Sequence, residues 1–100
     1  MIIVQVFPTA GNDAYRLLRH KVTHEVHTWS WGNKAKTRLK HTGSKRGYIE
    51  VGSIHGVLVA QIRPNEPADT YRLTETFLGR LTAWFENELV AINMQFVPED

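Results

Sequence analysis

Hydrophobic and polar residues alternate with different periods along the chain, and each change of period predicts a new secondary-structure element. Residues 2–7 are an apolar, β-branched run that a proline ends, as expected of a strand. Asn12 or Asp13 can cap a helix that begins at Ala14 and repeats apolar residues at helical spacing. We expect this helix to be short and to end at residues 22–23, where a strand-like pattern begins.

From about residue 22 to residue 63 the period is two, which predicts a series of strands. Residues 34–40 alternate strictly, and Gly32-Asn33 before them is suited to a two-residue hairpin turn. A hairpin closed there pairs Trp31 with Lys34, Trp29 with Lys36, His27 with Arg38 and Glu25 with Lys40 on one face, and Val26 with Leu39 and Thr28 with Thr37 on the other. This register separates apolar from basic side chains, which supports it.

A second hairpin is predicted at His55-Gly56. Its cross-strand pairs are Val51 with Ala60 and Ile49 with Ile62, which again gather apolar side chains on one face. A loop at residues 43–47 joins the two hairpins and would place Leu39 opposite Val51 and Lys40 opposite Glu50. The four strands together form an antiparallel meander.

A long helix is predicted at residues 68–89, after a proline-containing break, and a last strand at residues 90–96. The apolar stripe of this helix consists of Leu73, Phe77, Leu78, Leu81, Trp84 and Phe85. The order of elements predicts a single α+β domain over residues 1–100, a two-layer sandwich. Its mostly antiparallel sheet has the four-stranded meander at its centre, with a short N-terminal and a long C-terminal helix on one face.

The composition fits one small globular domain, since 42% of the 100 residues are hydrophobic and 22% are charged. The absence of cysteine excludes disulfides, thiolate metal sites and cysteine nucleophiles. The apolar runs are too short for a transmembrane helix, and the N-terminus lacks the pattern of a secretory signal. We therefore expect a cytoplasmic protein without a membrane partner.

Charge is distributed unevenly along the chain. Residues 1–50 carry nine Lys/Arg against three Asp/Glu, whereas residues 51–100 carry three against seven. Such a split favours a polyanion as partner, or a dimer in which oppositely charged faces attract each other. Two solvated faces of opposite charge would give the same pattern.

The predicted first hairpin has one basic and aromatic face, with Tyr48, Gln61 and Arg63 on the strands that follow. Cations can contact phosphates while flat rings stack bases, as in proteins that bind single-stranded nucleic acid. The sequence thus predicts a small non-enzymatic module for single-stranded DNA, RNA or another polyanion, with weak sequence preference. Its candidate binding residues are Trp29, Trp31, Lys34, Lys36, Arg38 and Lys40, extended by Lys45 and Arg46 in the connecting loop.

The same aromatic residues allow a second interpretation. Trp29 and Trp31 could anchor the interface of a homodimer or of a complex with another protein. Cross-strand Trp–Lys pairs could also stabilise the hairpin alone, through cation–π contacts of about 0.5–1 kcal/mol. The sequence leaves open which face of the sheet the helices cover, so Trp29 and Trp31 could also pack beneath the final helix.

Five histidines suggest metal binding or catalysis as further possibilities. His20 and His24 have the i, i+4 spacing of metal ligands on a helix, with His27 nearby, whereas the strand register would place His24 opposite His41. Neither arrangement offers a clear third ligand, so we expect no metal and no cofactor. A carboxylate beside a histidine, Glu50 near His41 or Glu25 near His24, would be needed for acid–base catalysis. No reaction is indicated, and a binding function is favoured over an enzyme.

Over residues 13–89, the meander between two helices resembles the double-stranded RNA-binding domain in topology. In that fold, the second helix begins with a Lys-rich stretch that contacts phosphates. Here Glu66, Ala68, Asp69 and Thr70 stand at this place, so the resemblance does not extend to the residues that bind RNA.

Overall fold

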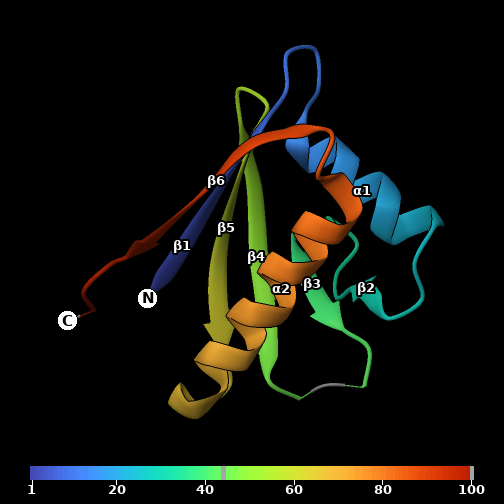
Figure 1. Cartoon of the computed structure of the whole chain (residues 1–100). Helices are drawn as coiled ribbons and strands as arrows, with labels where there is room; N and C mark the ends of the chain where they lie inside the picture. Colours follow the sequence, from blue (N-terminus) through green and yellow to red (C-terminus); the bar gives the residue numbers. More distant parts are fainter. Residues whose placement is uncertain (44, 100) are drawn as a thin grey trace.

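The computed structural model describes residues 1–43 and 45–99, which form a two-layer α+β sandwich (Figure 1). All strand pairs of the six-stranded sheet in this part of the chain are antiparallel, in the order β2-β3-β4-β5-β1-β6, and both helices lie on one face. The elements are β1 (Ile2–Pro8), α1 (Ala14–His24), β2 (Trp29–Trp31), β3 (Arg38–His41), β4 (Gly47–Ile54), β5 (Val57–Pro64), a 3-10 turn (Pro67–Asp69), α2 (Thr70–Phe85) and β6 (Leu89–Phe96). The predicted fold class is confirmed.

The second hairpin has the predicted register. Val51 lies opposite Ala60 and Ile49 opposite Ile62, and the turn is at His55-Gly56. His55 and Gly56 both have positive φ angles (51° and 82°), as a tight hairpin turn of this kind requires. The order β2-β3-β4-β5 confirms the meander, and β1 joins it by pairing with β5.

The first helix is longer than predicted. It continues through Val22 and Thr23 to His24, and the predicted end at residues 22–23 is wrong. Val22 is 4% exposed and continues the buried stripe of Ala14 and Leu18, so burial outweighs the preference of a β-branched side chain for a strand.

The N-terminus of α1 is as predicted, because Asp13 is the capping residue. Its carboxylate accepts a hydrogen bond of 3.1 Å from the backbone N–H of Arg16. This bond satisfies one of the N–H groups that have no partner within the first turn of a helix.

The first hairpin has a different register from the predicted one. Trp29 lies opposite His41 and Trp31 opposite Leu39, a shift of five residues. Residues 32–37 form a loop in place of the two-residue turn. The Asn33 carboxamide organises this loop: its Oδ1 accepts bonds of 3.1 Å from the backbone N–H groups of both Thr37 and Arg38.

A shift by an odd number of residues moves every side chain of a strand to the other face. It brings Trp29 under the helices, where it is 2% exposed. Removing the roughly 150–250 Å² of a tryptophan side chain from water is worth about 4–6 kcal/mol. The exposed Trp–Lys pairs of the predicted register would have contributed only about 0.5–1 kcal/mol each. Burial therefore decides the register.

The pairing of β3 with β4 also differs from the prediction, by two residues. Leu39 lies opposite Ile49 rather than Val51, and Glu50 lies opposite Arg38 rather than Lys40. An even shift keeps each side chain on its face, so Leu39 is still buried beneath the helices and the two cations are still on the uncovered side.

The second helix is shorter than predicted, because the chain turns after Phe85 and β6 begins at Leu89. Its buried side chains are Leu73, Thr74, Phe77, Leu81 and Phe85, whereas Leu78 and Trp84 are partly buried. Among the described residues, no helix combines the length and the apolar character needed to cross a membrane.

Candidate nucleic-acid interface

The two tryptophans that were expected to stack bases lie on the side of the sheet that the helices cover. Trp29 packs edge-on against Trp84 of α2, with ring centroids 6.4 Å apart, and against His41, at 5.2 Å. Trp31 is partly buried against the core, and its indole Nε1 donates a hydrogen bond of 3.3 Å to the Thr23 hydroxyl. The prediction that placed both rings on the uncovered face is wrong.

Lys34 and Lys36 lie in the loop between β2 and β3 rather than on a strand. The Lys36 carbonyl accepts a hydrogen bond of 2.9 Å from the Tyr15 hydroxyl, and its Nζ donates to the Thr23 hydroxyl at 3.3 Å. Lys36 thus lies beside α1, in a basic hollow whose other lining residues are Arg16, Arg19, His20, Thr23 and His24. Lys34 is exposed. The prediction that Lys34 and Lys36 belong to a strand is wrong.

The face of the sheet opposite the helices is uncovered, and strand alternation decides which side chains it carries (Figure 1). In β3, the buried Leu39 separates the exposed Arg38 and Lys40, which therefore lie on this open face as predicted. In β4 and β5, Ile49 and Ile62 are buried beneath the helices, so the residues next to them in each strand lie on the open face. At the end of β3, β4 and β5 away from the His55-Gly56 turn, the open face carries Arg38, Lys40, Tyr48, Glu50, Gln61 and Arg63, and nearer this turn it carries the apolar Ile54, Val57 and Val59.

The strand registers arrange these side chains in rows across the sheet. Tyr48 lies directly opposite Arg63 of β5. Continuing the β3–β4 register by one residue puts Lys40 on the other side of Tyr48. Because neighbouring strands are about 4.8 Å apart, the backbones of the two cations lie roughly 10 Å apart with the phenol ring between them.

The next row contains the only carboxylate among these six residues. Glu50 lies between Arg38 and Gln61, and it accepts a bond of 3.4 Å from Arg63 Nη2, which also donates to the Gln61 side chain. Both partners of this ion pair are about 40% exposed, so it contributes at most about 1 kcal/mol and is screened by salt. The six residues together carry an excess of positive charge: three cations to one carboxylate.

Arg38 covers the tyrosine at this end of the open face. Its guanidinium carbon lies 5.0 Å from the centre of the Tyr48 ring, the distance of a cation–π contact. A cation therefore lies over the face of the phenol ring, at the place that a stacked nucleic-acid base would take.

The open face over β1 and β6 carries uncharged amides among apolar side chains, since Ile3 and Phe7 alternate with the buried Val4 and Val6. Gln5 lies opposite Asn93, whose Nδ2 donates a hydrogen bond of 3.0 Å to the Gln5 side chain, and Gln95 lies opposite Ile3. Amide groups can donate and accept hydrogen bonds to the edges of bases. The open face thus changes from charged and aromatic at one end of β3–β5 to uncharged over β1 and β6, where the amides stand beside the apolar Ile3 and Phe7.

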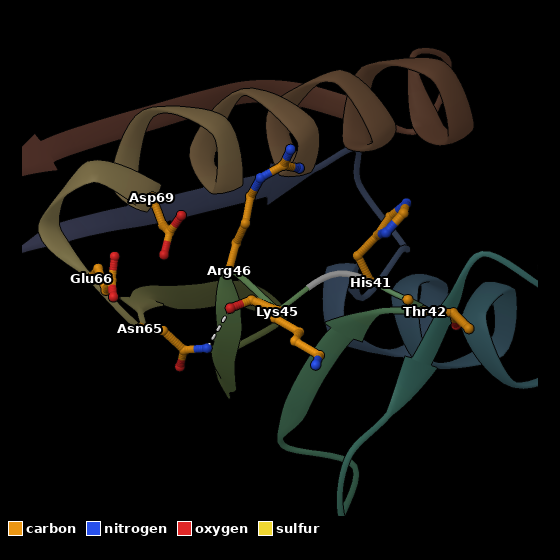
Figure 2. Close-up of a pocket in the computed structure, with 8 residues that line it drawn as sticks. His41, Thr42, Lys45, Arg46, Asn65, Glu66 and Asp69 are labelled. Carbon is orange, nitrogen blue, oxygen red and sulfur yellow. Dashed lines mark hydrogen bonds between the residues drawn. The ribbon is translucent and has the colours of Figure 1, made fainter.

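A cleft of about 680 Å³ lies at one end of the sheet, between the β3–β4 loop and the connection from β5 to α2 (Figure 2). Lys45 and Arg46 line it from the loop, and Glu66 and Asp69 line it from the opposite wall. The Asn65 backbone N–H donates to the Arg46 carbonyl at 2.8 Å, and its side chain donates to the Lys45 carbonyl. The two carboxylates offset the two cations, so this cleft offers a polyanion less than the open face does.

His41 also lines this cleft, and its Nδ1 is buried without a hydrogen-bond partner in the described part of the chain. The predicted pair of His24 and His41 does not form, since Trp29 takes the place opposite His41. Glu50 lies on the other face of the sheet, so the acid–base pair of Glu50 with His41 does not form either.

Two further histidines, His20 and His24, lie one turn apart in α1. The rings of His20 and His24 lie 4.8 Å apart, and His20 Nε2 lies 3.4 Å from a Glu25 carboxylate oxygen. Among residues 1–43 and 45–99, no group of three histidine or acidic side chains is arranged to hold a metal ion.

Sequence reasoning placed Tyr48, Gln61 and Arg63 on the open face but gave the stacking role to the tryptophans. The signal for Tyr48 was present, because it alternates with Ile49 and Val51 within one strand. No family model, curated protein or solved structure matches the chain.

Proposed function

We propose that the protein binds single-stranded nucleic acid on the open face of its sheet, centred on Tyr48 and the cations beside it. The observation that carries this proposal is the row of Lys40, Tyr48 and Arg63 across an uncovered face. The two cations contact phosphates, while the ring stacks a base for roughly 1–3 kcal/mol.

Arg38 has two positions in this mechanism. In the free protein its guanidinium covers the Tyr48 ring at 5.0 Å. An incoming base takes this place, and the displaced guanidinium becomes available to a phosphate, to which Arg can donate two parallel hydrogen bonds. The Tyr48 ring is thus covered until the ligand binds. The contact between Arg38 and Tyr48 is then replaced by two, one between the base and the ring and one between the guanidinium and a phosphate.

The remainder of the open face supports the strand without reading a defined sequence. Gln5, Asn93 and Gln95 can hydrogen-bond the edges of bases that extend beyond Tyr48. Their mutual bonds and rotatable side chains fit several bases equally well, so we expect weak sequence preference. The acidic residues of α2 and its ends, such as Glu75 and Glu86, belong to the opposite layer and do not oppose the approach of a polyanion.

Fluorescence anisotropy with labelled single-stranded DNA and RNA, titrated at several salt concentrations, tests the proposal. Three cations in contact with phosphates give a log–log salt slope of about −2 on single strands. Double-stranded oligomers of the same length should bind more weakly, because their bases are not free to stack on Tyr48.

Charge reversal identifies the binding face. The double variant Arg38→Glu/Lys40→Glu should weaken binding by at least about tenfold at low salt and should reduce the slope by about 1.4. Its matched control is Arg72→Glu/Arg80→Glu, which changes the net charge equally on exposed positions of α2, in the opposite layer. Equal losses in both double variants would indicate an effect of net charge alone and would contradict a site on the open face.

Replacing the ring separates stacking from charge. Tyr48→Ala should weaken binding by about 1–3 kcal/mol with an unchanged salt slope, whereas Tyr48→Phe keeps the ring and should bind almost normally. If Tyr48→Ala binds as tightly as the parent protein, no base stacks on this residue, and the proposed mechanism is wrong.

A further inference from the structure

The outer strand β6 presents unpaired backbone groups along one edge of the sheet. β6 pairs with β1, and no strand in the described part of the chain lies on its other side. Met1 and Val97 exchange two backbone hydrogen bonds of 2.8 Å, so they form one hydrogen-bonded pair of the β1–β6 ladder. Since such pairs alternate along antiparallel strands, the N–H and C=O groups of Ile92, Met94 and Phe96 point away from β1.

This edge lacks the features that usually keep sheets from pairing with each other. Edge strands are commonly short, charged or interrupted by proline. β2, at the other edge of the sheet, has three residues, whereas β6 has eight and contains no charged residue and no proline between Leu89 and Phe96. A single irregularity occurs near its beginning, opposite the step from Phe7 to Pro8.

The side chains beside this edge are apolar and exposed. Phe96 is 73% exposed and Met94 38%, although both lie on the face of the sheet that α2 covers further in. They line a groove with Tyr71 and Leu78 of α2, and Glu75, whose carboxylate accepts a bond of 2.7 Å from the Tyr71 hydroxyl, is the one charged residue in its lining.

We infer that the occupant of this edge is a second copy of the chain, bound through antiparallel pairing of β6 with β6. An antiparallel edge is complementary to itself, and a two-fold axis near Met94 pairs all three outward residues of each copy. Ile92 of one copy then lies opposite Phe96 of the other. Because residues 89–96 are uncharged, the two edges meet without repulsion, and their apolar side chains fill each other's grooves.

The area available is sufficient for a specific interface. The exposed parts of Phe96 and Tyr71 amount to about 200–350 Å² per copy, since an aromatic side chain buries roughly 150–250 Å² in full. With Met94, Leu78 and the strand edges added, two copies reach the order of 1,000 Å², the lower range of specific interfaces.

This pairing leaves the centre of the proposed nucleic-acid site free, because Lys40, Tyr48 and Arg63 lie on β3, β4 and β5, whereas β6 is the outer strand beyond β1. A two-fold axis perpendicular to the sheet would leave the open faces of both copies on the same side of one continuous twelve-stranded sheet. The helices of both copies would lie together on the other side.

Sedimentation equilibrium over a wide concentration range measures the association. We expect a mass of about twice 11.5 kDa that falls towards the monomer on dilution. Met94→Lys and Phe96→Lys should each raise the dimer dissociation constant at least tenfold, because the two-fold axis introduces every charge twice. The matched control is Ile54→Lys, which replaces an apolar residue of similar exposure at the tip of the β4–β5 hairpin and should leave the dissociation constant unchanged.

Amide hydrogen exchange, followed residue by residue in NMR spectra, shows which surface associates. In the dimer, the amides of Ile92, Met94 and Phe96 should become protected as the protein concentration rises. Those of Asn93 and Gln95, which face β1, should be protected at every concentration. A protein that stays monomeric at millimolar concentration overturns the inference. A dimer in which the three outward amides still exchange rapidly overturns it as well, because its copies would then meet elsewhere.

Discussion

Replacing Trp29 by alanine measures how much of the fold depends on the burial of a single ring. Trp29 is 2% exposed and contacts two other rings edge-on, those of Trp84 and His41. Truncating a buried tryptophan to alanine typically costs about 3–5 kcal/mol, from lost burial and from the cavity that remains. Since a domain of this length is stabilised by only about 5–15 kcal/mol, Trp29→Ala should remove a large share of the total.

Urea unfolding followed by far-UV circular dichroism gives the free energy of unfolding for Trp29→Ala and for a milder variant, Trp29→Phe. Trp29→Phe should lose less stability than Trp29→Ala, because the phenyl ring fills most of the cavity. Arg38→Ala is the comparison on the open face, where the loss of one exposed cation–π contact should cost no more than about 1 kcal/mol. Nucleic-acid affinity of the folded Trp29→Phe protein should equal that of the parent. A loss of less than about 1 kcal/mol in Trp29→Ala, together with weakened nucleic-acid binding, would refute the observed register and restore Trp29 to the open face.

Two glycines and one helix cap give further tests by the same unfolding assay. Gly47→Ala should be severely destabilising, by more than about 2 kcal/mol, because Gly47 has a φ of 129° and a Cβ there would collide with the Arg63 carbonyl. Gly79→Ala should instead stabilise by about 0.5–1 kcal/mol, since a Cβ at this exposed position of α2 meets nothing within 4 Å; a loss of stability would contradict the packing described for α2. Asp13→Ala should cost about 1 kcal/mol by removing the cap of α1, and Asn12→Ala less than half of that; equal costs would show that Asp13 is not the cap.

The two hairpins show where sequence reasoning succeeds and where it fails. The β4–β5 hairpin could be predicted pair by pair, because a tight turn at His55-Gly56 and the alternation of apolar residues on both strands agree on one register. The β2–β3 hairpin could not, because Gly32-Asn33 looks like a tight turn while the structure uses a six-residue loop held by the Asn33 side chain. A turn sequence alone does not determine the register when a long loop satisfies its backbone groups equally well.

The candidate interface was predicted only in part, because the predicted register of the β2–β3 hairpin was wrong. Arg38 and Lys40 flank Leu39 in sequence, so their shared face follows from strand alternation in either register. The placement of Trp29 and Trp31 depended on which residue of β3 each one faces, and it was wrong. Tyr48 gains its place in the site only from the pairing of β4 with β5, which sets it opposite Arg63.

The sequence by itself determined the local features of this protein: the strand and helix periods, a helix cap at Asn12 or Asp13, the β4–β5 register and the two-layer α+β class. These follow from contacts between residues that are near in sequence, or from the sharing of one apolar face. The tertiary structure alone decided that Trp29 is core rather than surface, that β1 pairs between β5 and β6, and that β6 is an exposed and apolar edge. Each of these depends on which distant surfaces are buried together, and the free energy of that burial exceeds the local preferences of the residues concerned.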